Sequence, residues 1–248
     1  MNRNYLNRTV IILLSTLLGI YNGFSQTKPL PSKGIISTKI IALKYESQID
    51  TLKIPVVSDK YPALKKALSE KNIFDGDDLA AVIKNYKSCG CGTTGLSYEV
   101  TYVSKDIISI IFYYQTMGAY PDDYQKYLTF NINKGEIYPI SSEVNSKGLT
   151  WLLAGYKTEL RKRILQLKED NTADNADAYT ELNTTIDSLT SDELFKNCVF
   201  KKEGIVLTIE KILPHVMQDT EPERDWLVPY SKLKIYKAPG AIVLNGRK

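Results

Sequence analysis

The stretch that decides the fold is residues 96–140, LSYEVTYVSKDIISIIFYYQTMGAYPDDYQKYLTFNINKGEIYPI. Apolar and polar residues alternate at its start, over 96–103, which predicts a strand with one buried face. Residues 107–115, IISIIFYYQ, are nearly all apolar, and this favours a central strand that is covered on both faces. A further strand is predicted over 124–133, after the loop GAYPDD at 118–123. The stretch is therefore predicted to be a meander of strands.

The segments around this meander predict a mixed fold. The residue types and periodicities predict two strands over 34–55, helices over 61–73 and 75–86, helices over 149–167 and 179–189, a hairpin over 197–212 and a strand over 226–230. This order indicates an α+β fold, with a mostly antiparallel sheet covered by helices. We expect two closely packed subdomains, 35–118 and 119–240, with the helices at 61–73 and 149–167 covering the central strand.

The first 25 residues have the layout of a secretory signal peptide. Two arginines precede an apolar run at 10–20, VIILLSTLLGI, and small residues follow, with cleavage expected near Ser25 or Gln26. The run is too short for an ordinary membrane span, although an uncleaved anchor is the alternative. Residues 26–34 then form a flexible leader. We expect an extracytoplasmic protein, periplasmic or secreted, without stable membrane insertion after cleavage.

The charge of the chain is small. The formal net charge is +4, and Arg3 and Arg8 lie in the expected signal peptide. Removal of these two charges from the +4 leaves +2 for the remaining chain. Such a value is too low to indicate binding to nucleic acid or to an anionic membrane surface. No nucleic-acid partner is therefore expected.

Three cysteines, Cys89, Cys91 and Cys198, bear on the disulfide and metal chemistry. An oxidising compartment favours a disulfide. Cys89 and Cys91 could pair with each other in a very small ring. A bridge from Cys198 to either of them would close a loop of roughly 110 residues and contribute about 4 to 5 kcal/mol in the chain-entropy model. We favour the long bridge. With a single histidine in the chain, no metal site and no cofactor are expected.

Tyrosines are concentrated around the predicted central loop. Tyr113, Tyr114, Tyr120, Tyr124 and Tyr127 lie within fifteen residues. A tyrosine combines a flat apolar ring with a polar tip, which suits recognition surfaces. The alternative is that Tyr113 and Tyr114 pack within the sheet and only Tyr120 and Tyr124 are exposed. In either case the loop is the best candidate for a binding surface.

A hydrolase is the second hypothesis. Asp122 and Asp123 lie in the same loop, and His215 precedes an acidic run at 219–225, DTEPERD. General acid–base catalysis needs two carboxylates set across a cleft, one with a shifted pKa. Adjacent aspartates do not give this geometry, and His215 has no identifiable nucleophile beside it. A binding role is therefore favoured over an enzymatic one. The candidate binding residues are Tyr120, Asp122, Asp123, Tyr124 and His215.

Several motifs in this order resemble a known family. They are the aromatic strand that ends in Gly118-Ala119, the strand and turn from Thr129-Phe130-Asn131 to Gly135, and the closing pattern from Glu203-Gly204-Ile205 to Pro229-Tyr230. Together they resemble a family of bacterial extracytoplasmic α+β domains of undefined role. The family is similar to the outer part of lysozyme-sensing anti-sigma factors and to the non-catalytic domain of some peptidoglycan deacetylases.

This resemblance implies a fold, a compartment and a class of partner. The implied partner is a peptidoglycan-related glycan or a secreted protein such as lysozyme. The family loop usually reads Gly-Ala-His, whereas this chain has Gly118-Ala119-Tyr120. No role that depends on that histidine therefore carries over to this chain.

Overall fold

The computed structural model describes residues 34–170 and 176–246. The expected signal peptide and almost all of the expected leader, residues 1–33, lie outside this part. The described residues form seven α-helices and two sheets, of five and three strands. The predicted α+β class is confirmed, and mostly antiparallel pairing is observed. None of the described helices combines the length and the apolar character needed to cross a membrane.

The first sheet has the strand order β1-β2-β3-β4-β5, so neighbours in the sequence are neighbours in space. Its strands are β1 (Ile36–Tyr45), β2 (Gln48–Val57), β3 (Gly92–Val103), β4 (Ile107–Met117) and β5 (Pro121–Asn131). All pairs are antiparallel except β2 and β3, which run parallel. Parallel neighbours need a long crossover connection, and the helices between β2 and β3 provide it.

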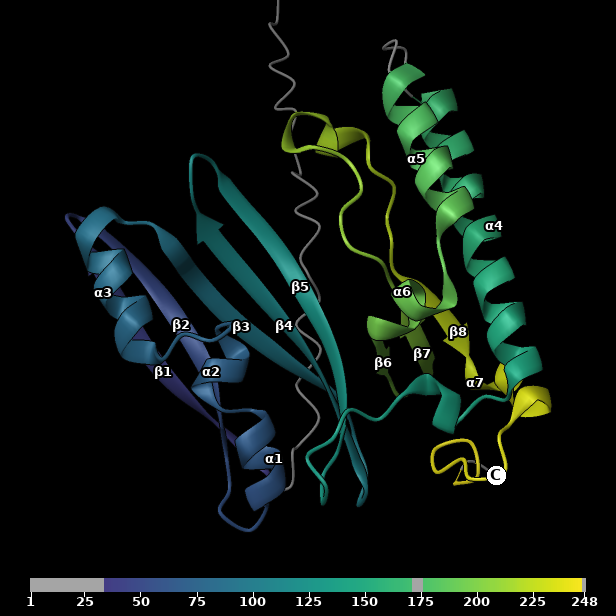
Figure 1. Ribbon diagram of the computed structural model, residues 1–248, viewed down its shortest axis with the longest axis horizontal. Coiled ribbons are helices and arrows are strands. Elements are labelled where there is room, and N and C mark those ends of the chain that lie inside the picture. Colours follow the sequence, from purple (N-terminus) through teal and green to yellow (C-terminus); the bar gives the residue numbers. More distant parts are fainter. Residues whose placement is uncertain (1–33, 171–175, 247–248) are drawn as a thin grey trace, which may run out of the picture.

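Three helices of this crossover cover one face of the first sheet (Figure 1). They are α1 (Pro62–Ala67), α2 (Glu70–Ile73) and α3 (Leu79–Cys89). Leu64 of α1 and Tyr86 of α3 are fully buried in the resulting core. Every second residue of β4 faces this core, including Ile108, Ile110 and Phe112.

The opposite face of β4 is covered by a second sheet. This sheet is antiparallel, in the order β6 (Cys198–Phe200), β7 (Gly204–Leu207) and β8 (Trp226–Pro229). Val199 of β6 and Val206 of β7 pack against Ile111 of β4 and Tyr127 of β5. The continuous apolar run of β4 is therefore explained by burial on both of its faces.

The helix predicted over 149–167 exists but has a different neighbour from the one we expected. It is α4 (Ser146–Asp170), which packs with α5 (Ala176–Ser188) and α6 (Ser191–Lys196). In Figure 1, α4 and α5 lie beyond the second sheet as seen from the first sheet. The expectation that α4 covers β4 was wrong because β6 and β7 lie between them.

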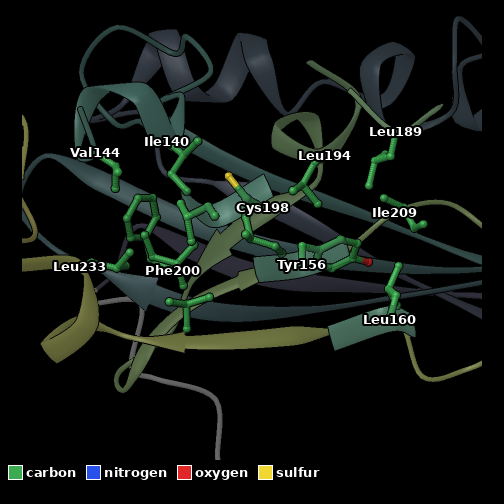
Figure 2. Close-up of a cluster of buried hydrophobic side chains, with 14 of the residues drawn as sticks. Ile140, Val144, Tyr156, Leu160, Leu189, Leu194, Cys198, Phe200, Ile209 and Leu233 are labelled. Atoms are coloured by element: carbon green, nitrogen blue, oxygen red, sulfur yellow. The ribbon is translucent and has the colours of Figure 1, made fainter. Parts of the chain in front are cut away.

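The second core contains residues of α4, α5 and the second sheet, and Figure 2 shows some of its side chains. Tyr156 and Leu160 of α4 belong to this core together with Phe200 of β6 and Leu233 of the short helix α7 (Tyr230–Leu233). All four side chains are buried. The buried side chains of α4 thus face the second sheet.

Hydroxyl groups connect the two sheets. Ser109 Oγ accepts the Phe200 N–H at 3.2 Å and lies 2.8 Å from Thr129 Oγ1. Thr101 Oγ1 donates to the Phe200 carbonyl at 2.8 Å, and Thr129 Oγ1 donates to the Cys198 carbonyl at 3.4 Å. The outward backbone groups of the edge strand β6 therefore find their partners on the face of the first sheet.

A buried carboxylate fixes the segment that follows α7. Glu143 has 0% exposure and follows the 3-10 helix η1 (Ile140–Ser142). Its carboxylate accepts the backbone N–H groups of Ile242, Val243 and Leu244 at 2.7, 2.8 and 2.9 Å. It also accepts the Tyr138 hydroxyl at 2.8 Å. Four donors thus compensate for the burial of one charged group.

The expected boundary between the subdomains, at 118 and 119, falls in the turn between β4 and β5. Both strands belong to the first sheet, which continues to Asn131. The helices and strands of the second core begin after this sheet, at η1 and α4.

We predict that Ser109→Ala lowers the free energy of unfolding by about 1 to 3 kcal/mol, because the buried Phe200 N–H loses its acceptor. Urea unfolding measures this change. The matched control is Ser37→Ala, on the exposed strand β1, where a Ser37 hydroxyl donates to Val56 at 3.3 Å. Its expected cost is below about 0.5 kcal/mol. Equal costs for the two variants would contradict the assigned role of Ser109.

Candidate functional site

The turn between β4 and β5 is shorter than predicted. The strand pairing runs from Ile107–Asn131 to Met117–Pro121, so Pro121, Asp122 and Asp123 belong to β5. The Gly118 N–H donates to the Tyr120 carbonyl at 3.2 Å and closes the turn. The side chain of Tyr120 is 72% exposed. The predicted loop is therefore a tight turn with one exposed aromatic residue.

Tyr124 supports the turn from one face of the hairpin. Its ring stacks on the buried Tyr114 ring, with centroids 4.6 Å apart and planes at 4°. Lys126 Nζ lies 5.0 Å from the Tyr114 centroid and forms an ion pair with Asp75 at 2.5 Å. The Tyr114 hydroxyl donates to the Ile73 carbonyl at 2.8 Å. Tyr124 is half-buried in this stack, so its ring serves to hold the hairpin.

Asp122 and Asp123 contact a loop that connects β7 to β8. Lys211 Nζ lies 2.7 Å from Asp122 Oδ1 and 3.5 Å from Asp123 Oδ1. Gln218 Oε1 lies 3.2 Å from the same ammonium group. The two aspartates are adjacent on one strand and share one cation. They do not face each other across a cleft, as general acid–base catalysis requires.

The acidic run at 219–225 is the last part of this same loop, and its carboxylates hold the loop in place. Glu221 accepts the backbone N–H groups of Ile212 and Leu213 at 3.0 and 3.2 Å, and it pairs with Arg224 at 3.2 Å. Asp225 accepts the Tyr127 hydroxyl at 2.8 Å. Burial and the Asp225 charge raise the pKa of Tyr127 far above its ordinary value. The carboxylates of Glu221 and Asp225 therefore have structural partners.

A second tyrosine–carboxylate pair lies nearby on the sheet. The Tyr113 hydroxyl donates to Glu99 Oε2 at 3.2 Å. Burial first, and then the charge of Glu99, raise the pKa of Tyr113. The sequence offered one signal for this pair, since both residues occur in predicted strands. It did not show that β3 and β4 would place them side by side.

His215 is the first residue of the 3-10 helix η2 (His215–Thr220). Its side chain is outside the part that the structure describes, so no contact is assigned to it. Its role as a binding residue stays a prediction. Among the described residues, no group of three or more His, Cys, Asp or Glu side chains is placed to hold a metal ion.

Two hollows of the described surface lie away from the hairpin. One, of about 460 Å³, lies along α4 and includes Arg161 and Leu165. Another, also of about 460 Å³, lies between the turn at Lys105 and the segment at Val243. Neither is lined by residues of the β4–β5 turn. These two hollows therefore do not contribute to the candidate site at Tyr120.

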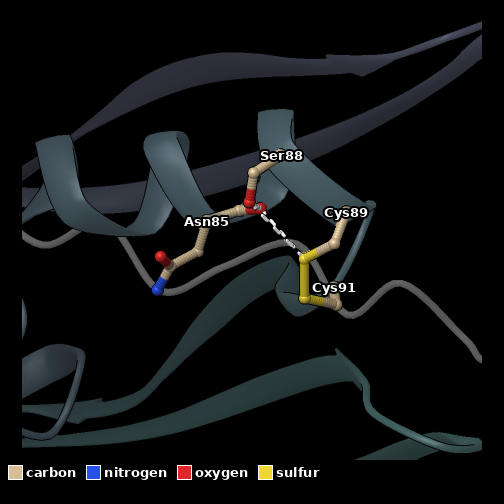
Figure 3. Close-up of a disulfide and its surroundings, with 4 residues drawn as sticks. All are labelled: Asn85, Ser88, Cys89 and Cys91. Carbon is tan, nitrogen blue, oxygen red and sulfur yellow. Dashed lines mark hydrogen bonds between the residues drawn. A yellow bond between two sulfur atoms is a disulfide. The ribbon is translucent and has the colours of Figure 1, made fainter.

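The disulfide joins Cys89 to Cys91, and our preference for a bridge to Cys198 was wrong (Figure 3). Gly90 ends α3 in the left-handed conformation, with φ of 64°. This reversal brings the two Cα atoms within 5.1 Å. A side chain at residue 90 would overlap the ring of Tyr45. The local backbone therefore decides the pairing, against the entropy gain of a longer loop.

Cys198 is buried in the second core as a free thiol (Figure 2). It starts β6, and its neighbours include Leu194 and Phe200. Burial raises the pKa of the Cys198 thiol to about 12. The thiol therefore remains protonated at neutral pH and packs as a small apolar group.

We predict that iodoacetamide at pH 8 leaves Cys198 unmodified in the folded protein and alkylates it in denaturant. The reason is that the reactive form is the thiolate, and the raised pKa and burial keep its population very low. Mass spectrometry of tryptic peptides measures the modification and also maps the disulfide. Alkylation of Cys89 or Cys91 in the denatured, unreduced protein would contradict the assigned pairing.

Comparison with known proteins gives one result on the fold. No family model matches the chain, and no curated protein matches it. A DUF3298 family protein from Pseudomonas aeruginosa PAO1 is similar over 83% of this chain and 95% of its own length, with a TM-score of 0.51 and 12% identity. A DUF3298 family member from Bacteroides fragilis NCTC 9343 is similar over 83% of this chain and 93% of its own length, with a TM-score of 0.47 and 16% identity.

The first of these similarities shows a shared fold. The structural neighbours of this chain are therefore members of a domain family of unknown function, as the resemblance in the sequence implied in general terms. The narrower likeness to anti-sigma factors and deacetylases stays a prediction. At 12% identity, no residue role is transferred from the neighbour to this chain.

Proposed function

We propose that this protein is an extracytoplasmic, non-enzymatic binding or sensor module that recognises a cell-envelope partner through the end of the β4–β5 hairpin. The partner class is a peptidoglycan-related glycan or a secreted protein such as lysozyme. The observation that carries the proposal is Tyr120, an aromatic side chain with 72% exposure at the tip of a supported hairpin. The predicted signal peptide and the Cys89–Cys91 disulfide support the compartment.

The hairpin is held in place from both sides, which favours recognition. The Tyr114–Tyr124 stack and the Lys126–Asp75 ion pair hold one face. Lys211, in the loop between β7 and β8, holds the start of β5 from the other side. A rigid surface loses less conformational entropy when a ligand binds. Tyr120 is therefore presented on a preorganised support.

Both partner classes fit the chemistry of an exposed tyrosine. The apolar ring face can stack on the C–H groups of a sugar, while the hydroxyl hydrogen-bonds. In protein interfaces, tyrosine is one of the residues that carry most of the binding energy.

The hydrolase alternative has less support in the geometry. Asp122 and Asp123 share the ammonium group of Lys211 and lie next to each other on one strand. Asp122→Asn combined with Asp123→Asn tests it directly. A loss of any turnover of peptidoglycan by this double variant, relative to the parent protein, would revive the hydrolase.

We predict that Tyr120→Ala lowers the affinity for the true partner at least about tenfold, because a central tyrosine of an interface contributes on the order of 2 kcal/mol. Isothermal titration calorimetry with peptidoglycan fragments and with lysozyme measures this change. The matched control is Ile137→Ala, which removes an exposed apolar side chain that follows β5 and forms a bridge with Phe130, at the end of β5 away from the turn.

Two results would overturn the proposal. One is the lack of any binding heat with both classes of ligand for the parent protein. The other is equal loss of affinity in Tyr120→Ala and Ile137→Ala, which would place the contact elsewhere. Unchanged unfolding curves of both variants ensure that the comparison reports binding.

A further inference from the structure

The charged residues are unevenly distributed along the chain, although the net charge is small. Residues 226–248 contain no aspartate or glutamate. The same 23 residues contain five basic side chains, at Lys232, Lys234, Lys237, Arg247 and Lys248. The first three lie in the described part of the chain. The charged side chains of this segment are therefore all basic, although the net charge of the whole protein is low.

The fold adds a fourth lysine to this segment. The 3-10 helix η3 (Lys234–Tyr236) follows α7 and lies against the first turn of α4. The Asn145 N–H donates to the Tyr236 carbonyl at 2.8 Å, and Val144 forms a bridge with Lys237. Tyr236 also packs on Gly148, at the start of α4. Lys147 is therefore brought beside the lysines of α7 and η3.

We name the resulting surface the basic end. It consists of Lys147, Lys232, Lys234, Ile235 and Lys237, all of them exposed. Within residues 34–170 and 176–246, none of its four lysines forms an ion pair with a carboxylate. Like charges without counter-charges produce a local positive potential. The basic end and the β4–β5 turn lie at opposite ends of the molecule (Figure 1).

An exposed apolar side chain lies among the lysines of the basic end. Ile235 is 79% exposed, more than any other large hydrophobic side chain among the described residues. Beside it, Tyr236 and Trp151 stack with ring centroids 5.4 Å apart and are only half-buried. Lysines around an exposed aliphatic side chain and interfacial aromatics are typical of surfaces that bind the headgroup region of anionic bilayers.

We propose that the basic end docks on the surface of a bilayer that contains anionic phospholipids. The lysines attract the headgroup phosphates, and Ile235 enters the headgroup–acyl boundary. The contact is peripheral and does not span the membrane. It goes beyond the proposed function, since it directs the β4–β5 turn away from the bilayer, toward a partner in the envelope. A soluble polyanion would use the lysines but would give Ile235 no role.

The test is cosedimentation of the purified protein with two kinds of vesicle, phosphatidylcholine alone and phosphatidylcholine mixed with phosphatidylglycerol. Binding to the anionic vesicles alone is expected, and it should weaken as salt is added, because salt screens exposed charges. The neutral vesicles report any binding that does not depend on charge. Equal binding to both kinds would overturn the proposal.

Substitutions then locate the contact. The triple variant Lys232→Gln, Lys234→Gln, Lys237→Gln should bind the anionic vesicles about a hundredfold more weakly, at about fivefold for each lysine. The matched control is Lys39→Gln, Lys44→Gln, Lys53→Gln, which removes the same charge from the exposed strands β1 and β2. Equal losses in the two triple variants would show an unspecific effect of charge and overturn the assignment.

The role of Ile235 distinguishes a bilayer partner from a soluble polyanion. Ile235→Ser should weaken vesicle binding, whereas binding to heparin, a soluble polyanion, should not change. If Ile235→Ser binds vesicles as the parent does, the bilayer is the wrong partner. Tyr120→Ala should bind vesicles normally, so a failure of the hairpin proposal and a failure of this one give different results.

Discussion

The structure depends on the hydrogen bonds that join β6 to the face of the first sheet. β6 is an edge strand, and its outward backbone groups would otherwise be buried without partners, at considerable cost. Ser109, Thr129 and Thr101 supply the missing partners from three neighbouring strands. This requirement explains why polar residues interrupt an otherwise apolar meander. It also fixes where the second sheet, and with it α4, is placed.

The sequence predicted the elements better than it predicted their neighbours. Periodicity located the strands of the meander and the helix α4, because each signal lies within a few adjacent residues. The partner of Ser109 is 91 residues away, and no local pattern reveals it. The disulfide was missed for the opposite reason. A general entropy argument favoured a long loop, while the left-handed conformation of Gly90 decided the pairing locally.

The candidate site shows the same division. An exposed aromatic turn followed from the residue types around Tyr120, and the structure places that side chain in solvent. The pairing of Asp122 with Lys211 could not be predicted, since it requires the loop after β7 to reach the hairpin. The basic end was hidden by a small net charge, because charges elsewhere in the chain cancel it. Local distribution, and not the total, determines the potential that a partner meets.

The four hydrogen bonds of Glu143 set a condition on the timing of folding. Its backbone donors at 242–244 follow it by 99 to 101 residues. A ribosome that adds about 5 to 20 residues per second needs roughly 5 to 20 seconds to make that length. During this interval the carboxylate has only water and Tyr138 as donors. This corner of the second core therefore stays hydrated in the nascent chain, while the first sheet already has all its strands.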